Sequence, residues 1–388
     1  MPTFFIKTTT CLYLKAAFLN KIVHNLDNPF GNDYCTQMKI FILLPYAGGS
    51  HEYWAQTIIE NSHHQVTVFK LPGRYWKWRM HGAASYFAQI INQQRETPDI
   101  FLATSMMNIV EFRGLLHQSF ASVPLYLYFH ENQFAYPISS KDPDRNSQRL
   151  EHFQFIQLQS FIAADKVFFN SRYNQQTFLE GAHDLLRKLP DYKDHLGRGI
   201  KRESSIWPIY IETKEFSQCT DKSKNKQPVF IWNHRWEEDK NPEEFFNFLK
   251  SYRELGHDFK LIVCGKESSN PLFSWVEETF KRQLIHFGEA KTRVQYLDLL
   301  AQSTHSILTS YHDFYGLSAI ELVLSKVNVF FPNRLAYPEH FDKQTWQLIS
   351  YNKINDVIAK LNQATPKGIT NIIIEKNKLA LRILAQLS

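Results

Sequence analysis

From Met38 onward, short apolar runs alternate with longer segments of mixed polar and apolar residues. Runs rich in Ile, Val and Phe, such as MKIFILL at 38–44, are typical of buried strands. Strands are predicted in the first half of the chain at 38–44, 66–70, 99–104, 124–129 and 166–170. Helices are predicted between and after them near 52–60, 82–94, 108–118, 148–164 and 171–188. This alternation is typical of a parallel sheet covered by helices on both faces.

The same pattern restarts after a polar, lysine-rich stretch. Strands are predicted in the second half at 228–232, 259–264, 284–287, 306–310 and 328–331. A helix is expected to begin at Asn241-Pro242, because Asn caps a helix and Pro suits its first position. The predicted fold class is therefore α/β, with two doubly wound, Rossmann-like domains that face each other across a cleft. That is the GT-B arrangement.

The predicted domain boundaries follow from these patterns. They give an N-terminal extension at 1–37, an N-terminal domain at 38–211 and a linker at 212–227. A C-terminal domain follows at 228–368, and a final helix at 369–388 is placed to pack back on the N-terminal domain. Met38 is a second possible start, so 1–37 is open to being an extension, a peripheral element or an over-long reading of the gene.

Composition narrows the class of protein. The hydrophobic fraction is 44% and the charged fraction 21%, which are ordinary values for a folded chain. No apolar run is long enough for a transmembrane helix. The four cysteines form no CxxC pair and no zinc spacing, which fits a reducing compartment, and we expect a cytoplasmic protein.

The positive charge is modest but uneven. The net charge is +6, and the stretch from Lys70 to His81 contains four basic residues and no acidic one. Basic patches attract polyanions such as nucleic acids. Scattered, solvated lysines and arginines are the alternative interpretation.

The strongest candidate for a ligand site follows the predicted strand at 306–310. It has the sequence YHDFYGLSAIE and enters a helix near Gly316. A helix N-terminus that begins at a glycine suits a phosphate. Asp313 and Glu321 are eight residues apart, so both carboxylates can face one cleft and hold the hydroxyls of two sugar rings. An ordinary strand–turn–helix with a capping Asp is the alternative.

Two cations follow the first strand of the second half. Arg235 and Lys240 lie just before the expected helix start, where they can converge on a diphosphate, since Arg binds it through two hydrogen bonds and Lys as a point charge. His130, at the end of the strand at 124–129, could bond a sugar hydroxyl or transfer a proton. Gly48 and Gly49 allow a ligand to approach the backbone closely. Asp142-Pro143-Asp144 resembles a metal-binding DxD motif, but its polar setting favours an ordinary loop.

Six segments together resemble the tRNA-queuosine α-mannosyltransferases, within family 4 of the retaining GT-B glycosyltransferases. They are PYAGGSH (45–51), LPGRYWKWR (71–79), YFHENQ (128–133), FFNSRYN (168–174), HRWEEDKNPEEFF (234–246) and HDFYGLSAIE (312–321). The resemblance covers about 38–345. It implies GDP-mannose as the donor, and the cyclopentene-diol of queuosine in the anticodon of tRNA-Asp as the acceptor.

The resemblance also assigns roles to residues. The implied catalytic residues are His130, Arg235, Lys240 and Asp313. The implied donor-binding residues are Gly48, Gly49, Arg235, Lys240, Gly265, Lys266, Gly288, Glu289, Asp313, Phe314, Tyr315, Gly316, Leu317 and Glu321. The implied acceptor and tRNA contacts are Ser50, His51, Arg74, Tyr75, Trp76, Lys77, Trp78, Arg79, Glu131, Asn132 and Gln133. The family usually has Glu at the position of Asp313, so the contact with the donor sugar is expected to shift by about 1 Å or to pass through water.

The resemblance further implies that the configuration at the anomeric carbon is retained, because the acceptor attacks from the same face as the departing diphosphate. This route needs no metal and no other cofactor. In the basic-aromatic run at 74–79, Trp and Tyr can stack on splayed bases while Arg and Lys meet phosphates. An aromatic packing cluster is the alternative for this run. Two other functions stay open: a family 4 transferase with another donor or with a glycan, lipid or protein acceptor, and a tRNA-binding protein that has lost catalysis.

Overall fold

A computed structural model describes residues 37–137, 149–191, 193–216, 227–267, 269–361 and 369–387 of the chain. Almost all of the predicted extension, most of the predicted linker and the Asp142-Pro143-Asp144 motif lie outside the described residues.

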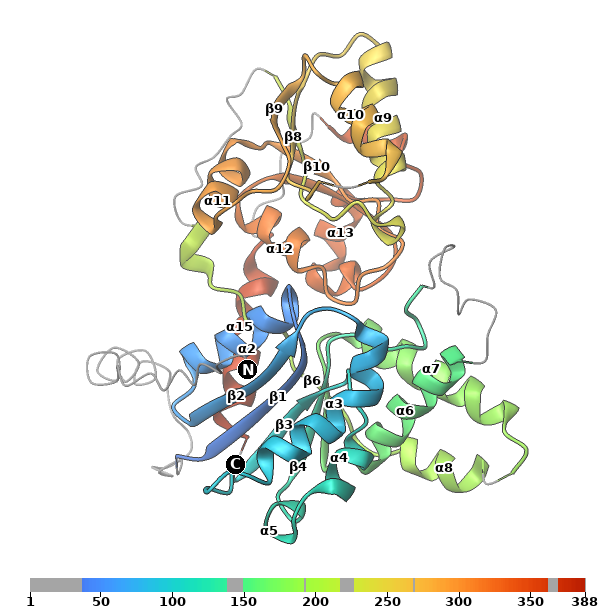
Figure 1. Ribbon diagram of the computed structural model, residues 1–388. Coiled ribbons are helices and arrows are strands. Elements are labelled where there is room, and N and C mark those ends of the chain that lie inside the picture. Colours follow the sequence, from blue (N-terminus) through green and yellow to red (C-terminus); the bar gives the residue numbers. More distant parts are fainter. Residues whose placement is uncertain are drawn as a thin grey trace. The chain divides into compact units, whose positions relative to one another are not determined.

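The first domain contains a six-stranded sheet in which all paired strands are parallel. In spatial order its strands are β2 (Gln65–Pro72), β1 (Lys39–Ala47), β3 (Ile100–Thr104), β4 (Leu125–Phe129), β5 (Lys166–Phe169) and β6 (Ser205–Ile206). The helices of this domain are α2 (Ser50–Asn61), α3 (Trp76–Ile91), α4 (Ile109–Leu115), α5 (Gln118–Ala121), α6 (Arg149–Ala163), α7 (Arg172–Lys188) and α8 (Lys193–Ile200). Figure 1 shows these helices around the sheet.

Alternate residues of the central strands enter two different cores, because successive side chains of a strand point to opposite faces. Phe41 and Phe101 join one cluster with Phe87 of α3 and Phe178 of α7. Ile40, Ile42 and Leu102 belong to another cluster that contains Trp54 of α2. The sheet is thus buried on both faces, as continuous apolar strands require.

The second domain repeats the plan with a second six-stranded parallel sheet. In spatial order its strands are β12 (Ser350–Tyr351), β11 (Asn328–Pro332), β10 (His305–Ile307), β7 (Val229–Trp232), β8 (Lys260–Val263) and β9 (Leu284–Phe287). Its helices are α9 (Pro242–Glu254), α10 (Pro271–Thr279), α11 (Arg293–Gln302), α12 (Leu317–Leu324), α13 (Lys343–Ile349) and α14 (Asp356–Lys360). Short 3₁₀ turns lie at Thr213–Phe216 (η1), Glu238–Lys240 (η2) and Tyr337–His340 (η3).

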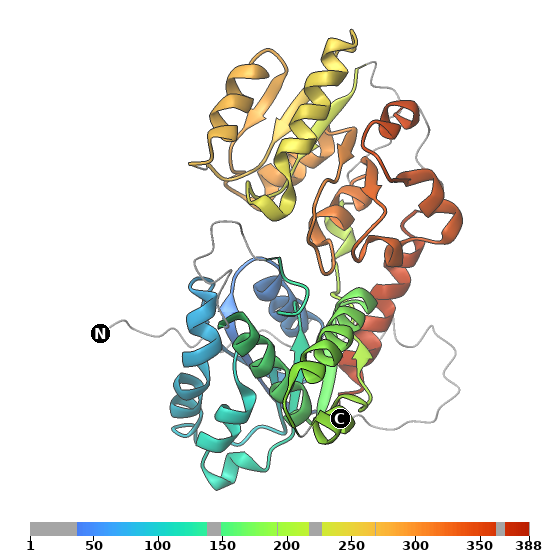
Figure 2. The same cartoon turned by 90° about the vertical axis from the view of Figure 1, so that its right-hand side faces the viewer.

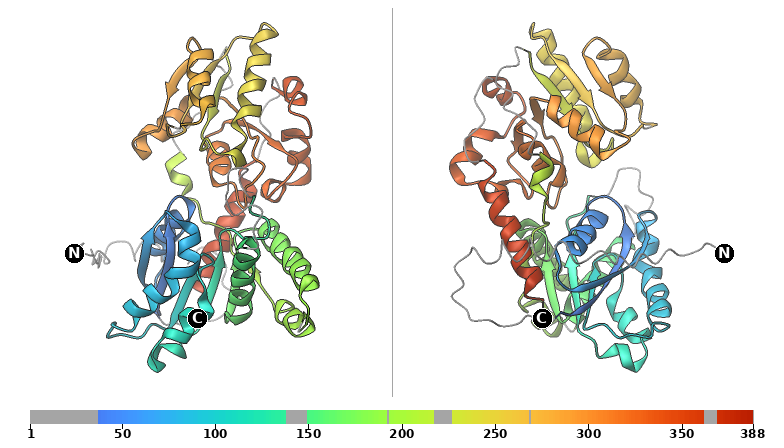
Figure 3. Two further views of the ribbon diagram at one scale, coloured as in Figure 1. Left: turned by 45° about the vertical axis from the view of Figure 1, so that its right-hand side comes forward. Right: turned by 90° about the vertical axis from the view of Figure 1, so that its left-hand side faces the viewer.

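The C-terminal helix α15 (Asn371–Ala385) packs against the first domain. Its residues Ile373, Ala380 and Leu384 belong to the core cluster that contains Trp54. The amide of Asn377 bonds both the N–H and the carbonyl of Ile211, at 3.0 and 2.7 Å. Figures 2 and 3 show this helix in red, running alongside the strands of the first sheet.

Direct contacts also hold the carboxyl ends of the two sheets together. The Ser171 hydroxyl, which caps α7, donates a hydrogen bond of 2.6 Å to the carbonyl of Phe314. The carboxylate of Glu339 in η3 accepts the N–H groups of Arg172 and Tyr173, at 2.9 and 2.6 Å. A carboxylate at a helix N-terminus is favourable because it compensates the helix dipole.

Two local predictions were wrong. Asn241 does not cap α9 with its side chain: its backbone is left-handed, with φ of 50°, and its amide bonds the carboxylate of Glu244 instead. Helix α3 begins at Trp76, six residues before the predicted start at 82, because Tyr75 takes a left-handed turn with φ of 56° directly before it. Most of the basic-aromatic run therefore lies on the first turn of a helix.

Candidate active site

A cavity of about 650 Å³ lies where the loops after the strands of both sheets meet. The loop after β4 contributes His130 and Glu131, and the loop after β7 contributes Arg235 and Lys240. The segment from His312 to Leu317, after β10, lies on the same side of the cavity as Arg235 and Lys240. The carboxyl ends of parallel strands are where open α/β sheets bind ligands.

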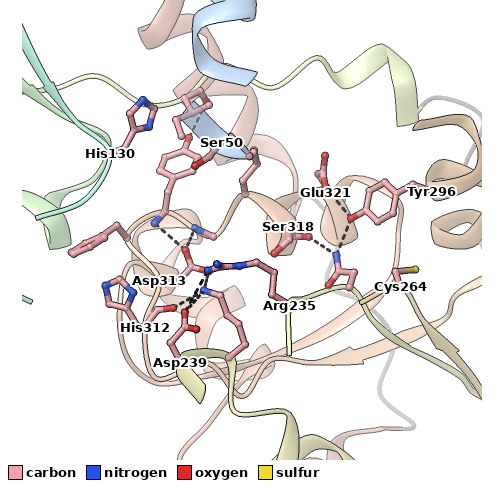
Figure 4. A pocket seen from close by; sticks show the side chains of 18 of the residues that line it. Ser50, His130, Arg235, Asp239, Cys264, Tyr296, His312, Asp313, Ser318 and Glu321 are labelled. Atoms are coloured by element: carbon pink, nitrogen blue, oxygen red, sulfur yellow. Dashed lines mark hydrogen bonds and ion pairs between the residues drawn. The ribbon is translucent and has the colours of Figure 1, made fainter. Parts of the chain in front are cut away.

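Lys240 is the centre of a polar network on the second-domain wall of the cavity. Its Nζ donates to the carbonyl of His312 at 2.7 Å and forms ion pairs with Asp239 at 3.3 Å and Asp313 at 3.6 Å. Figure 4 shows Asp239, His312 and Asp313 gathered at one end of the site. Burial alone would raise the pKa of Asp313, but Lys240, His234, His312 and the backbone N–H of Tyr315 together outweigh it, so this pKa is lowered and the group stays ionised.

The carboxylate of Asp313 organises its own loop. One oxygen accepts the backbone N–H of Gly316 at 2.6 Å and of Tyr315 at 3.3 Å, and the other accepts the Tyr337 hydroxyl at 3.3 Å. The shorter Asp side chain thus fixes the turn that leads into α12. Asp313 also lines the cavity, so the same residue can contact a ligand while it holds the loop.

Gly316 is the residue before α12, and no other residue type fits there easily. Its φ is 82°, and a Cβ at this position would lie 2.9 Å from the ring of Tyr337. The first N–H groups of α12 have no partner within the helix and, with the dipole, favour an anion at this end of the cavity.

Arg235 extends from the loop after β7 and remains accessible. Its guanidinium is 2.6 Å from Glu237 and 4.0 Å from Asp239, and its side chain is 58% exposed. Burial would lower the pKa of Arg235, but these two carboxylates raise it. Lys240, Arg235 and the start of α12 therefore bring positive charge to one wall, which suits a diphosphate.

Glu321 marks the other end of the same wall. Its two oxygens accept hydrogen bonds from Arg293 at 2.7 Å and from the Tyr296 hydroxyl at 2.9 Å. The Asn233 amide donates to the same hydroxyl, also at 2.9 Å. Burial raises the pKa of Glu321, and Arg293 opposes that shift. Figure 4 shows Glu321, Tyr296 and Ser318 grouped away from the Lys240 network.

The first-domain wall has a different character. The His130 ring stacks on His51 with centroids 4.0 Å apart, and it meets the edge of Trp54. Among the described residues, neither ring nitrogen of His130 has a hydrogen-bond partner. Burial, with a smaller contribution from His51, lowers the pKa of His130 well below its ordinary value, so its imidazole is neutral.

Many residues predicted from sequence line this cavity. They are Gly49, Ser50, His130, Glu131, Arg235, Lys240, Glu289, Asp313, Phe314, Tyr315, Gly316, Leu317 and Glu321. Others do not line it: Gly48, His51, Arg74, Tyr75, Trp76, Lys77, Trp78, Arg79, Asn132, Gln133, Gly265, Lys266 and Gly288.

The placement of Asn132 and Gln133 differs from their predicted role as acceptor contacts. Asn132 is fully buried, and its amide bonds the Asn174 side chain at 2.9 Å and the N–H of Phe134 at 3.0 Å. The N–H of Gln133 donates to Gln157 at 2.7 Å. These residues hold the loop that carries His130 and Glu131, because a buried amide must satisfy its hydrogen bonds internally.

Several lining residues were missed from sequence. Asn170, Asn233, Asp239, Arg293 and Tyr296 all face the cavity. Asn170 and Asn233 directly follow strands, and that position was the only local signal for them. Arg293 and Tyr296 lie on the first turn of α11, where nothing in the sequence distinguishes them from ordinary surface residues.

The basic-aromatic run lies on the first domain, outside the cavity lining. Tyr75 is 72% exposed and Trp78 is 63% exposed. Trp76 is partly buried, with its ring 5.2 Å from that of Phe153. The run therefore combines one packing residue with two exposed aromatic side chains beside Arg74 and Lys77.

Two further features concern all of the described residues. No group of three or more His, Cys, Asp or Glu side chains there could hold a metal ion. No described helix is both long and apolar enough to cross a membrane.

Comparison with solved structures identifies the class of protein. The chain is similar to the N-terminal domain of a trehalose-6-phosphate phosphatase from Candida albicans, with a TM-score of 0.63, 13% identity, and coverage of 92% of this chain and 97% of that one. It is also similar to a glycosyltransferase from Rickettsia africae, with a TM-score of 0.60, 15% identity, and coverage of 91% and 98%. The two parallel-sheet domains, the cavity between their strand ends and these neighbours define the GT-B glycosyltransferase fold.

Sequence comparison then gives the family. Residues 39–210 match the model of the tRNA-queuosine alpha-mannosyltransferase N-terminal domain, and residues 214–366 match glycosyl transferases group 1. A tRNA-queuosine alpha-mannosyltransferase from Drosophila melanogaster is 31% identical over 340 residues, which are 84% of this chain and 87% of that protein. The chain belongs to the tRNA-queuosine alpha-mannosyltransferase family, and it is a hexosyltransferase. The resemblance recognised in the sequence is confirmed.

Proposed function

We propose that this protein transfers mannose from GDP-mannose to the cyclopentene-diol of queuosine in the anticodon of tRNA-Asp, with retention of configuration. The family supplies the sugar and the modified tRNA. The observation that carries the proposal is one cavity in which Arg235, Lys240 and the N-terminus of α12 lie on the second-domain wall and a neutral histidine lies on the first-domain wall.

The donor would lie along the second-domain wall. Arg235, Lys240 and the N-terminus of α12 would hold the diphosphate, and Glu321 would accept the ribose hydroxyls. Asp313 would contact hydroxyls of the sugar, directly or through water. His130 lies across the cavity, where its neutral imidazole can bond a sugar hydroxyl without attracting the diphosphate.

The reaction would follow a same-face route. The acceptor hydroxyl oxygen forms a bond to the anomeric carbon as the bond from that carbon to the diphosphate oxygen breaks. The departing diphosphate takes the hydroxyl proton, so GDP and the mannosylated nucleoside are the products. Negative charge grows on the diphosphate, and the cations of this wall stabilise it. The proposal includes no metal and no other cofactor, because protein groups supply that positive charge.

The tRNA would approach over the first domain. Tyr75 and Trp78 are exposed enough to stack on splayed anticodon-loop bases, and Arg74 and Lys77 can meet phosphates. Residues of this kind bind single-stranded RNA without reading its sequence. A cytoplasmic location, where tRNA is used, is part of the proposal.

Incubation with GDP-mannose and queuosine-containing tRNA-Asp, followed by nucleoside mass spectrometry, tests the proposal. We expect a gain of one hexose on queuosine and none on tRNA with unmodified guanine at that position. Hexose transfer from UDP-glucose but not from GDP-mannose would overturn the donor. Thermal stabilisation by GDP without any transfer to the tRNA would overturn the acceptor.

A further inference from the structure

The cations of the cavity are already matched to acidic partners on their own wall. Lys240 pairs with Asp239 and Asp313, and Arg293 pairs with Glu321 at 2.7 Å. Arg235 pairs with Glu237. Each of these pairs joins residues of the second domain, and none of them includes the acidic residue of the first-domain wall.

That residue is Glu131, which follows His130 at the end of β4. Among the described residues, no hydrogen bond or ion pair involves its carboxylate, although Glu131 lines the cavity and is partly buried. Burial raises its pKa to about 7, and the opposing influence of Arg235 is too weak to cancel this. Glu289, the other lining acid with no ion pair among the described residues, is exposed to water and pays no such cost.

The backbone around Glu131 is held firmly, so the group is not a loose surface carboxylate. The Ser105 hydroxyl donates to the carbonyl of Glu131 at 3.0 Å. The next residue, Asn132, is anchored in the domain interior by its amide. A carboxylate fixed in a partly buried wall, with no ion pair among the described residues, is the arrangement expected of a binding group that a ligand completes.

The donor cannot supply a counter-charge, because its diphosphate is an anion that Glu131 would repel and its sugar hydroxyls are neutral. The ligand that brings a positive charge must therefore be the acceptor. Queuosine joins its cyclopentene-diol to the base through a secondary amine, and aliphatic amines are protonated at neutral pH. We propose that the carboxylate of Glu131 binds this ammonium group and so distinguishes the modified nucleoside from guanine. This inference rests on the proposed function.

Such a contact would also position the diol. The amine and the reacting hydroxyls belong to one small rigid unit, so an ion pair at the amine fixes the ring beside His130 and the donor sugar. Unmodified guanine offers no charge at this position, and it would leave Glu131 desolvated without compensation. Selection against unmodified tRNA follows from that cost.

Binding of three forms of tRNA-Asp that differ only at the modified base tests the inference. One carries 7-aminomethyl-7-deazaguanine, which has the ammonium but no diol. The second carries the neutral 7-cyano-7-deazaguanine, and the third carries guanine. We expect the protein to bind the aminomethyl form about tenfold more tightly than the cyano form. Glu131→Gln should abolish this preference while leaving the affinity for GDP unchanged.

Two further variants serve as controls. Glu52→Gln removes one negative charge from the exposed surface of α2, where Glu52 pairs with Lys70, and it should keep the full preference. Glu131→Asp keeps the negative charge but places it one methylene further from the cavity, so this variant should keep part of the preference for the aminomethyl form. Equal binding of the aminomethyl and cyano forms by the unchanged protein, or a preference that survives in Glu131→Gln, would overturn the inference. Because binding is measured without transfer, failure of mannose transfer would count against the proposed function alone.

Discussion

The two walls of the cavity are built on the same kind of sheet, yet they treat polar groups in opposite ways. On the second-domain wall, Lys240, Asp313 and Glu321 are all held by ion pairs or hydrogen bonds within that domain. On the first-domain wall, the ring nitrogens of His130 have no hydrogen-bond partner, and the carboxylate of Glu131 forms no hydrogen bond or ion pair, among the described residues. The second-domain wall is therefore prepared for a charged ligand in advance, whereas the polar groups of the first-domain wall depend on what binds there.

This difference suits the two substrates. A diphosphate is the same in every turnover, so its site can be fixed in advance by a network that needs no rearrangement. The acceptor must be told apart from many similar nucleosides. Groups that lose their hydration and are completed only by the correct ligand provide that selection.

Breaking the prepared wall at Lys240 should have the largest effect. Lys240→Met removes the cation that joins Asp239, Asp313 and the loop at His312, so we expect transfer to slow by about a thousandfold. The affinity for queuosine-containing tRNA should stay within about twofold, since no tRNA contact is removed. Steady-state kinetics and a tRNA binding assay check this, with Lys250→Met, on the exposed side of α9, as the matched control.

Arg235→Ala should slow transfer less than Lys240→Met does, because the side chain of Arg235 is 58% exposed. Full turnover in the Arg235→Ala variant, measured by the same kinetics, would refute the donor site.

A second prediction concerns the other end of the same wall. Arg293→Gln leaves the buried carboxylate of Glu321 without its cation, so we expect GDP to bind about 10–50-fold more weakly. In a Glu321→Gln background the same change should cost much less, because the two residues act as a unit. Glu215→Gln removes only the exposed partner of Arg293 and should change GDP affinity by less than about threefold. Equal losses in both backgrounds would show that Arg293 acts independently of Glu321.

The exposed aromatic residues of the first domain allow a sharper test of tRNA binding. Combined Tyr75→Ala and Trp78→Ala replacement should weaken tRNA binding about tenfold and leave GDP affinity and thermal stability unchanged. Trp76→Ala should do the reverse, lowering the free energy of unfolding by about 2 kcal/mol, because its ring packs on Phe153. Filter binding and thermal melts separate the two outcomes. Weakened tRNA binding in Trp76→Ala alone would contradict this division.

The smallest expected effect is on stability, and it depends on pH. The pKa of Glu131 is about 7 in the folded protein against an ordinary value of 4.5. Between these values the folded state keeps a proton that the unfolded chain loses, so Glu131 makes the protein less stable as pH rises towards 7. Glu131→Gln should therefore be more stable than the unchanged protein at pH 8, by roughly 1–2 kcal/mol, with a smaller difference at pH 5. Urea unfolding at both pH values measures this, and a gain of equal size at the two would contradict it.

Local patterns were sufficient for most of the fold. The predicted strands at 166–170 and 284–287 differ from β5 and β9 by at most one residue, because continuous apolar runs between polar segments leave few alternatives. The two-residue strands β6 and β12 were not predicted, since Ser205–Ile206 and Ser350–Tyr351 are too short to carry a pattern. They pair only because a neighbouring strand offers a free edge.

By itself the sequence determined the order of strands and helices, the family, and the residues that follow strands: Arg235, Lys240, His130 and the loop from Asp313 to Glu321. These are local properties, set by periodicity and by residue type at a strand end. Only the tertiary structure decided that Asn132 points into the domain, that Arg293 from α11 reaches Glu321, and that Glu131 is buried in the cavity wall without an ion pair among the described residues. Those facts depend on which distant segments pack together. Neighbouring residues of one loop can point in opposite directions, as Glu131 lines the cavity while Asn132 lies in the domain interior.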